Sequence, residues 1–422
     1  MPSRRNLEDD SDRSKIAKIA KDAFENMSDA DFFSSRVKHL YFYGPVTRDS
    51  VLTLKASIRQ ANRDVVSPSI GGPTTDPVIV APLPIVIHVN SFGGEAHAMQ
   101  TIFSAFAESR MPICAIVDGV SASASTILTA GAPYRVIVPS SASLFHEWSM
   151  RFDRSVTMRK PDVEMTISEM AMHDVGYYDA IQKRSKMTKE QLKTLTKRDL
   201  FLDSKQCLQK GFADRLLAIG KKGMTRTKMR IHEIREVLRD PLVNHVTVMP
   251  DKESDENVVD PVVLELDRIL QQDTKARKTV VVHFNQGYTE DIDKEMTHSF
   301  YSKTVPLLTR LRVLSDLATN GSNLIGVVDS IIDVVSAIPF LHCKVRSMYS
   351  SAIFVIHAVY GRASAMMLDD VMENTKTTFS EVRKILTERT KLPKKILDHM
   401  HETRIVLNAK QCLDYGIVDV LL

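Results

Sequence analysis

Residues 85–95 of this 422-residue chain read IVIHVNSFGGE. The apolar run at 85–89 is typical of a strand buried on both faces, as strands of a parallel sheet are. Two glycines follow, which allow a tight turn. Apolar residues then return at helical spacing, at Met99, Ile102, Phe103 and Phe106. The stretch therefore predicts a strand, a turn and a helix, which together make one β-α unit.

Similar units lie on both sides of this stretch. Strands are predicted at 39–43, 113–117 and 135–138, and helical periodicity follows the first two. A proline- and glycine-rich loop is expected at 63–84, and a long helix at 163–186. Strands that alternate with helices in this way predict a layered α/β domain with a mainly parallel sheet.

The second half of the sequence repeats the first. The string KQCL occurs at 205–208 and again at 410–413, and VIHVN at 86–90 returns as VVHFN at 281–285. The separation along the chain between Asp118 and Asp329 equals the separation between His146 and His357. The repeat predicts two tandem domains, at 36–221 and 244–422, with a charged N-terminal segment at 1–35 and a linker at 222–243.

Composition excludes several classes of protein. The 56 basic and 52 acidic residues leave a net charge of +4, too weak a surplus to indicate nucleic-acid binding. No run of 18 apolar residues is present, so we expect no membrane-spanning helix, and the charged N-terminus lacks the apolar core of a secretory signal. Four scattered cysteines predict neither a disulfide framework nor a metal site. We expect a soluble cytoplasmic protein without metal or cofactor.

Ser123 is the leading candidate for a catalytic residue. It lies between a predicted strand and an apolar helix, where backbone N–H groups point outward and can stabilise an oxyanion. Ser121 and Ser125 compete with it within the same run. His146 at the next strand end, Asp199 further along and the upstream glycines at 93–94 complete the parts of a hydrolytic triad.

Residues 36–221 resemble the proteolytic subunit of the Clp protease family, the ClpP-type serine endopeptidases. NSFGG at 90–94 is similar to the family's Asn-Ser-Pro-Gly-Gly turn, and GVSAS at 119–123 to its Gly-Met-Ala-Ala-Ser nucleophile motif. LFH at 144–146 and KRDLF at 197–201 resemble its Met-Ile-His and Arg-Asp-x-Phe segments. The resemblance singles out Ser123 from its neighbours and implies the ClpP/crotonase-like fold, a superhelical β-α repeat, for both domains.

The resemblance implies peptide-bond hydrolysis by Ser123 as nucleophile, His146 as base and Asp199 as its orienting acid. Backbone amides of Gly94 and Ala124 would stabilise the oxyanion. The family also implies polypeptide substrates, a ring-shaped homo-oligomer and a separate AAA+ unfoldase, because no G-x-x-x-x-G-K-[ST] motif for ATP binding occurs in this chain.

The second half resembles the same family but lacks most of these groups. The repeat spacing maps Ser123 onto Val334 and Asp199 onto Arg404, and the Gly-Gly turn onto 288–289 (YT). A slip of two positions would bring Ser336 to the nucleophile position instead. His357 alone is retained, so we expect a degenerate, structural domain.

Other functions share parts of this pattern. A signal peptide peptidase A type enzyme is also a tandem but uses a Ser–Lys dyad, and a crotonase-like acyl-CoA enzyme shares the fold. A non-catalytic scaffold and a specialised protease, such as one that matures a viral capsid, stay open as alternatives.

Overall fold

The computed structural model describes most of the chain, and the description below is confined to those parts: 15–63, 83–147, 181–220, 226–248, 260–272, 279–285, 300–317, 323–356, 368–400 and 402–422, with isolated positions between them. Several features predicted from the sequence lie outside the described residues. These are the loop at 64–82, most of the helix at 163–186, the pair at 288–289, and His357.

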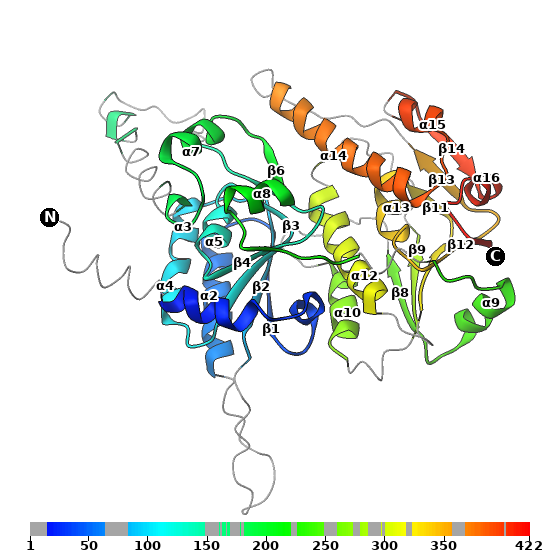
Figure 1. Cartoon of the computed structure of the whole chain (residues 1–422), viewed down its shortest axis with the longest axis horizontal. Helices are drawn as coiled ribbons and strands as arrows, with labels where there is room; N and C mark the ends of the chain where they lie inside the picture. The colour runs from blue at the N-terminus through cyan, green and yellow to red at the C-terminus, as the bar shows by residue number, and fades with distance from the viewer. Residues whose placement is uncertain are drawn as a thin grey trace, which may run out of the picture.

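The first half contains a seven-stranded sheet with helices on both sides (Figure 1). Strands β1, β2, β3, β4 and β7 lie in that order and are parallel, while β5 pairs parallel with β3 and antiparallel with β6. Its elements are η1 (Asp29–Phe33), β1 (Lys38–Tyr43), α2 (Arg48–Arg63), β2 (Ile85–Ser91), α3 (Ala96–Gln100), α4 (Ile102–Glu108), β3 (Ile113–Ala122), α5 (Ser125–Gly131), β4 (Tyr134–Ile137), β5 (Ala142–Leu144), α7 (Lys189–Thr196), β6 (Phe201–Asp203), α8 (Ser204–Lys210) and β7 (Arg215–Leu216).

The second half contains a parallel sheet in the order β8-β9-β10-β12-β15 and a small sheet in which β13 pairs parallel with β11 and antiparallel with β14. Its elements are α9 (Ile231–Arg239), β8 (Asn244–Val248), α10 (Pro261–Leu270), β9 (Val280–Phe284), the π-helical turn η3 (Phe300–Thr304), α12 (Val305–Leu317), β10 (Leu324–Val328), β11 (Ile331–Asp333), α13 (Val334–Phe340), β12 (Val345–Met348), β13 (Ile353–Ile356), α14 (Leu368–Arg389), α15 (Lys394–His399), β14 (Ile405–Asn408), α16 (Ala409–Asp414) and β15 (Val420–Leu421).

The α/β fold with parallel sheets predicted from the sequence is confirmed. The two halves also share local signals that start and stop their elements. Asp203 begins α8 and Asn408 begins α16 through the same capping box, in which the glutamine three residues later returns the hydrogen bond. Gly211 and Gly416 follow these helices with positive φ. Equal strand orders and equal caps are the structural basis for proposing a duplication.

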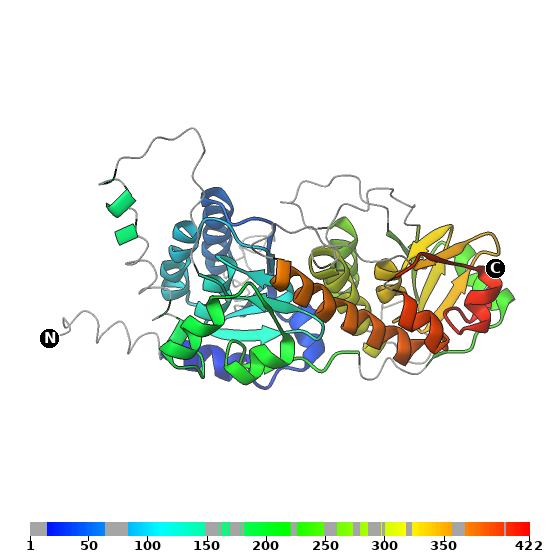
Figure 2. The same ribbon diagram turned by 90° about the horizontal axis from the view of Figure 1, so that it is seen from above.

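One core runs through both halves. Helix α12 is buried along almost its whole length between the first sheet and the second half, which Figures 1 and 2 show lying side by side. Its Leu308 and Leu311 belong to the same apolar cluster as Val120 and Tyr134 of the first sheet. The two halves are therefore packed as one body rather than held by a linker alone.

The N-terminal segment and the predicted linker both contribute buried apolar side chains, the first to this core and the second to a separate cluster. Residues 15–24 form a helix, and Phe24, Phe32 and Phe33 are fully buried. In the predicted linker, Ile234 of α9 is buried against the second sheet beside Val281. The N-terminal segment covers the sheet of the first half, and α9 covers the corresponding sheet of the second half. The charged residues of both segments therefore lie on their outer faces.

Candidate active site

Ser123 lies at the sharp turn between β3 and α5. Its φ is 56°, a left-handed value that a non-glycine residue adopts only where the surrounding structure holds it. Its backbone N–H donates to the carbonyl of Leu144 at 2.9 Å, which fixes the turn against β5. The side chain is partly exposed, whereas most residues around it are buried. The arrangement presents one hydroxyl at the end of a central strand.

The two competing serines are buried packing residues. The hydroxyl of Ser125 donates to the backbone carbonyls of Ser91, at 3.0 Å, and Ala122, at 2.8 Å. The hydroxyl of Ser121 lies 3.0 Å from that of Thr129, and both Ser121 and Ser125 are fully buried. Their hydroxyl groups join strands to α5, which leaves Ser123 as the serine of this run that faces outward.

The Gly-Gly turn lies directly against Ser123. Gly93 has a φ of 99°, and a Cβ added there would come within 2.6 Å of the Ser123 Cβ and 3.0 Å of the Ala124 nitrogen. Gly94 has a φ of 143° and a Cβ on it would meet the Val46 carbonyl oxygen at 2.3 Å. Only glycine fits at either position, so the backbone of 93–94 forms one wall beside the serine and the Ala124 amide.

His146 and Asp199 are brought together at the same edge. Strand β5 pairs with β3 so that Leu144 is opposite Ala122, and His146 and Ser123 each follow these paired strand ends. The Nδ1 atom of His146 lies 3.4 Å from Oδ1 of Asp199, and both side chains are partly exposed. An imidazole held through Nδ1 by a carboxylate leaves Nε2 for proton transfer, as a histidine base requires.

The segment that carries Asp199 is held by α14 of the second half. The Asp199 N–H donates to the Asp370 carboxylate at 2.9 Å, and the Asn374 side chain bonds both the Asp199 carbonyl, at 2.7 Å, and the Phe201 N–H, at 2.9 Å. Arg198 also pairs with Asp370 and with Glu373. Helix α14 thereby supplies side-chain partners for the backbone groups of this short loop.

Sequence reasoning missed this role of α14. Asp370 and Asn374 are four residues apart, one helical turn, and so share a face. That spacing is visible in the sequence, but nothing in the sequence says that the face meets residues 198–201. Phe201 also contacts Tyr301 of η3, with ring centroids 5.2 Å apart, so two elements of the second half border the site.

The corresponding place in the second half carries a different set of side chains. Val334 follows β11 as Ser123 follows β3, and its side chain is buried. Arg404 is exposed just before β14, where Asp199 precedes β6. Ser336 lies within α13, and its N–H donates to the capping carboxylate of Asp333 at 2.8 Å. Within the described ranges, the second half brings no serine, histidine and aspartate together.

Groups of three or more His, Cys, Asp or Glu side chains arranged to hold a metal ion do not occur among the described residues. All four cysteines are buried thiols. No helix in the described part of the chain is both long and apolar enough to cross a membrane.

Residues 81–220, which contain every candidate of this site, match the family described as Clp protease. This part of the chain is therefore similar to the Clp protease family. It is also similar to the ATP-dependent Clp protease proteolytic subunit 2 of Leifsonia xyli subsp. xyli, at 30% identity over 139 residues. The similarity covers 32% of this chain and 61% of that protein. The family match lies wholly in the first half of the chain.

Loss of the Asn374 side chain should weaken catalysis without abolishing it. In Asn374→Ala the Asp199 segment loses two of its backbone partners, and we expect kcat on a fluorogenic peptide to fall by about 10- to 100-fold with KM little changed. Lys376→Ala, an exposed change on the same helix, is the control. If Asn374→Ala keeps the wild-type kcat, α14 does not position Asp199.

Proposed function

We propose that the chain is a Ser-His-Asp serine endopeptidase. The observation that carries this proposal is the pairing of β3 with β5, which sets Ser123 and His146 past adjacent strand ends while Asp199 contacts the imidazole. The strained backbone at Ser123 supports the same conclusion, because such strain gathers at functional sites. The match of this region to the Clp protease family favours peptidase activity.

In the proposed reaction, Ser123 Oγ attacks the carbonyl carbon of a peptide bond while His146 Nε2 accepts its proton. Asp199 orients the imidazole and stabilises its charged form. The tetrahedral oxyanion accepts hydrogen bonds from the Ala124 and Gly94 amides, and removal of such a donor costs about 3–4 kcal/mol in other serine hydrolases. His146 then gives the proton to the leaving amine, and water repeats the sequence on the acyl-enzyme.

We propose that the second half is a degenerate copy of the first, with domains at 36–221 and 244–422. Equal strand order, equal capping boxes and the repeated sequence strings support the duplication. Val334 offers no nucleophile and Arg404 no carboxylate, so its role is structural. It covers the first sheet and, through α14, holds the loop of Asp199.

The proposed substrates are polypeptides, and the proposed reaction is itself independent of ATP. A Clp-type domain suggests action in the cytoplasm within a ring of several copies, fed by a separate AAA+ unfoldase where folded substrates are degraded. These proposals rest on the Clp protease match of residues 81–220, and they extend the properties of that family to the whole chain.

A fluorophosphonate probe tests the proposal. We expect covalent labelling of the wild-type chain at Ser123, located by peptide mass mapping, and none in Ser123→Ala. His146→Ala should label at least about 100-fold more slowly, because its serine hydroxyl has lost the base. A wild-type chain that stays unlabelled and hydrolyses no peptide would instead favour a non-catalytic scaffold.

A further inference from the structure

The strand that leads to the candidate nucleophile is bulged just before it reaches the site. Strands β2 and β3 are paired in register on both sides of the bulge, at Val89–Val117 and at Ser91–Ser121. Between these pairs β2 has one residue, Asn90, whereas β3 has the three residues 118–120. A bulge interrupts the backbone hydrogen bonds between two strands and bends the strand that carries the extra residues. The direction in which β3 enters the site therefore depends on how the bulge opposite Asn90 is held.

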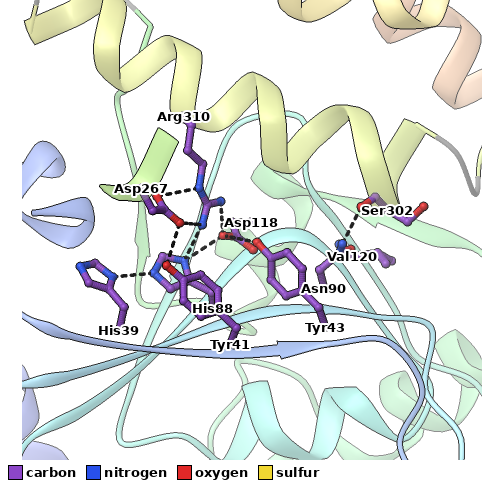
Figure 3. Close-up of polar contacts among 10 residues, drawn as sticks. All are labelled: His39, Tyr41, Tyr43, His88, Asn90, Asp118, Val120, Asp267, Ser302 and Arg310. Atoms are coloured by element: carbon purple, nitrogen blue, oxygen red, sulfur yellow. Dashed lines mark hydrogen bonds and ion pairs between the residues drawn. The ribbon is translucent and has the colours of Figure 1, made fainter. Parts of the chain in front are cut away.

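The Asn90 side chain fills this bulge and bonds in two directions (Figure 3). Its Oδ1 accepts a hydrogen bond from the Val120 N–H at 3.2 Å, and its Nδ2 donates to the Ser302 carbonyl of η3 at 2.6 Å. Asn90 is 7% exposed and Val120 is completely buried. A buried backbone N–H requires a hydrogen-bond partner, and here a side chain supplies it. Asn90 thus joins the end of β2 to β3, and both strands to the second half.

Element η3 lies close against the same point of β3. A Cβ added to Gly119 would come within 2.3 Å of the Asn90 Oδ1 and 2.8 Å of the Tyr301 carbonyl oxygen. Arg310 of α12, the helix that directly follows η3, contacts the neighbouring Asp118 carboxylate. The Ser302 carbonyl is therefore presented to Asn90 by backbone that is packed tightly on the bulge.

Both strands that Asn90 joins continue into the candidate active site. Strand β2 leads to the Gly93–Gly94 turn, and β3 leads to Ser123. These two segments are in contact, since a Cβ on Gly93 would lie 2.6 Å from the Ser123 Cβ. The two amides proposed for the oxyanion, of Gly94 and Ala124, come one from each segment. A shift of one strand end against the other would therefore move the amides relative to the serine hydroxyl.

The equivalent stretch of the second half is built differently. Asn285 corresponds to Asn90 in the repeated string. Strand β10 ends at Val328 and β11 begins at Ile331, and the two strands belong to different sheets. In the first half, β3 instead runs through the bulge to Ala122 within one sheet. The continuous strand thus occurs in the half that carries the serine.

We propose that Asn90 is a positioning residue for peptide hydrolysis. It holds the end of β3, and with it Ser123, in place against the Gly93–Gly94 turn, and the Ser302 carbonyl of the second half holds Asn90. It acts through the backbone of the two strands rather than on the reacting atoms. This inference rests on the proposed function and adds to it a residue outside the Ser-His-Asp set. A misplacement of about 1 Å in an active site costs about 100-fold in rate, so a brace at this point matters to catalysis.

Asn90→Ala tests the proposal. We expect kcat on a fluorogenic peptide and the rate of fluorophosphonate labelling at Ser123 to fall together by about 10- to 100-fold. KM should change little, because the variant loses geometry and not a contact with the substrate. Hydrogen exchange of the backbone amides at 119–122 should become at least about 10-fold faster. Asn90→Ser, which leaves a smaller polar group in the bulge, takes the place of Asn90→Ala should that variant not fold.

Asn62→Ala is the matched control. The Asn62 side chain also bonds backbone groups of two segments: Oδ1 accepts from the Arg110 N–H at 2.8 Å, and Nδ2 donates to the Ile58 carbonyl at 2.7 Å. These bonds lie near the start of β3, at the opposite end from Ser123. We expect a loss of thermal stability similar to that of Asn90→Ala, with the wild-type kcat retained.

The outcomes separate this inference from the proposed function. A folded Asn90→Ala variant with the wild-type kcat would overturn the positioning role and leave the proposed function in place. Equal losses of kcat in Asn90→Ala and Asn62→Ala would overturn it too, because they would reflect stability alone. A rise in KM at unchanged kcat would assign Asn90 to substrate binding instead. A wild-type chain that neither hydrolyses peptides nor labels at Ser123 contradicts the proposed function itself, and the positioning role falls with it.

Discussion

Ser123→Ala should reduce the rate of peptide hydrolysis by about 10⁴-fold or more, because in the proposed mechanism Ser123 forms the acyl-enzyme. The fold should be retained. The Ser123 backbone N–H bonds Leu144 whichever side chain is present, and alanine removes only one partly exposed oxygen. The measurement is turnover of a fluorogenic peptide under saturating conditions, with thermal unfolding as the check on structure.

Ser121→Ala and Ser125→Ala are the matched controls. Their hydroxyl groups bond within the packing of α5, so each change should lower stability by about 1 kcal/mol while most of the activity remains. An inactive Ser125→Ala together with an active Ser123→Ala would show that the nucleophile has been assigned to the wrong serine.

Arg310→Met should produce the largest loss of stability of any single substitution considered. Arg310 is buried between Asp118 and Asp267, and its removal leaves two buried carboxyl groups without their cation. Removal of one partner from a buried ion pair costs about 3–5 kcal/mol. We expect a loss of this size in the free energy of unfolding, measured by urea denaturation at neutral pH.

The pH dependence of that loss gives a second check. Burial alone would raise the pKa of Asp118, but the charges of Arg310 and His88 outweigh it and hold the pKa below its ordinary value. Without Arg310 the carboxyl group takes up a proton more readily, so the penalty should shrink as the pH falls. Arg268→Met is the control. Its exposed pair with Glu265 should contribute less than about 1 kcal/mol, and equal losses from the two variants would contradict the role of Arg310.

The sequence predicted the elements of the fold because their signals are local. The alternation of β1 and β2 with helices is confirmed. The order of the candidate site residues was equally readable, since each follows a strand end or a turn. The catalytic roles of Ser123, His146 and Asp199 stay predictions.

Contacts between the halves could not be predicted in this way. Arg310 looks like an ordinary basic residue of an amphipathic helix, and its partner Asp118 is 192 residues away. Asn374 likewise lies 175 residues from Asp199. Periodicity shows which face of an element is apolar, but it carries no information about which distant polar side chains that face meets.

The dependence of the first half on Arg310 and Asn374 has a consequence during protein synthesis. Residues 36–220 are synthesised before either residue, and about 90 further residues must be added to reach Arg310, which takes roughly 5–20 s. In that interval the nascent chain lacks the cation for Asp118, and later still the helix that holds Asp199. On the proposed mechanism, proteolytic competence arises only after α14 has been translated, so the order of the two halves in the reading frame delays it.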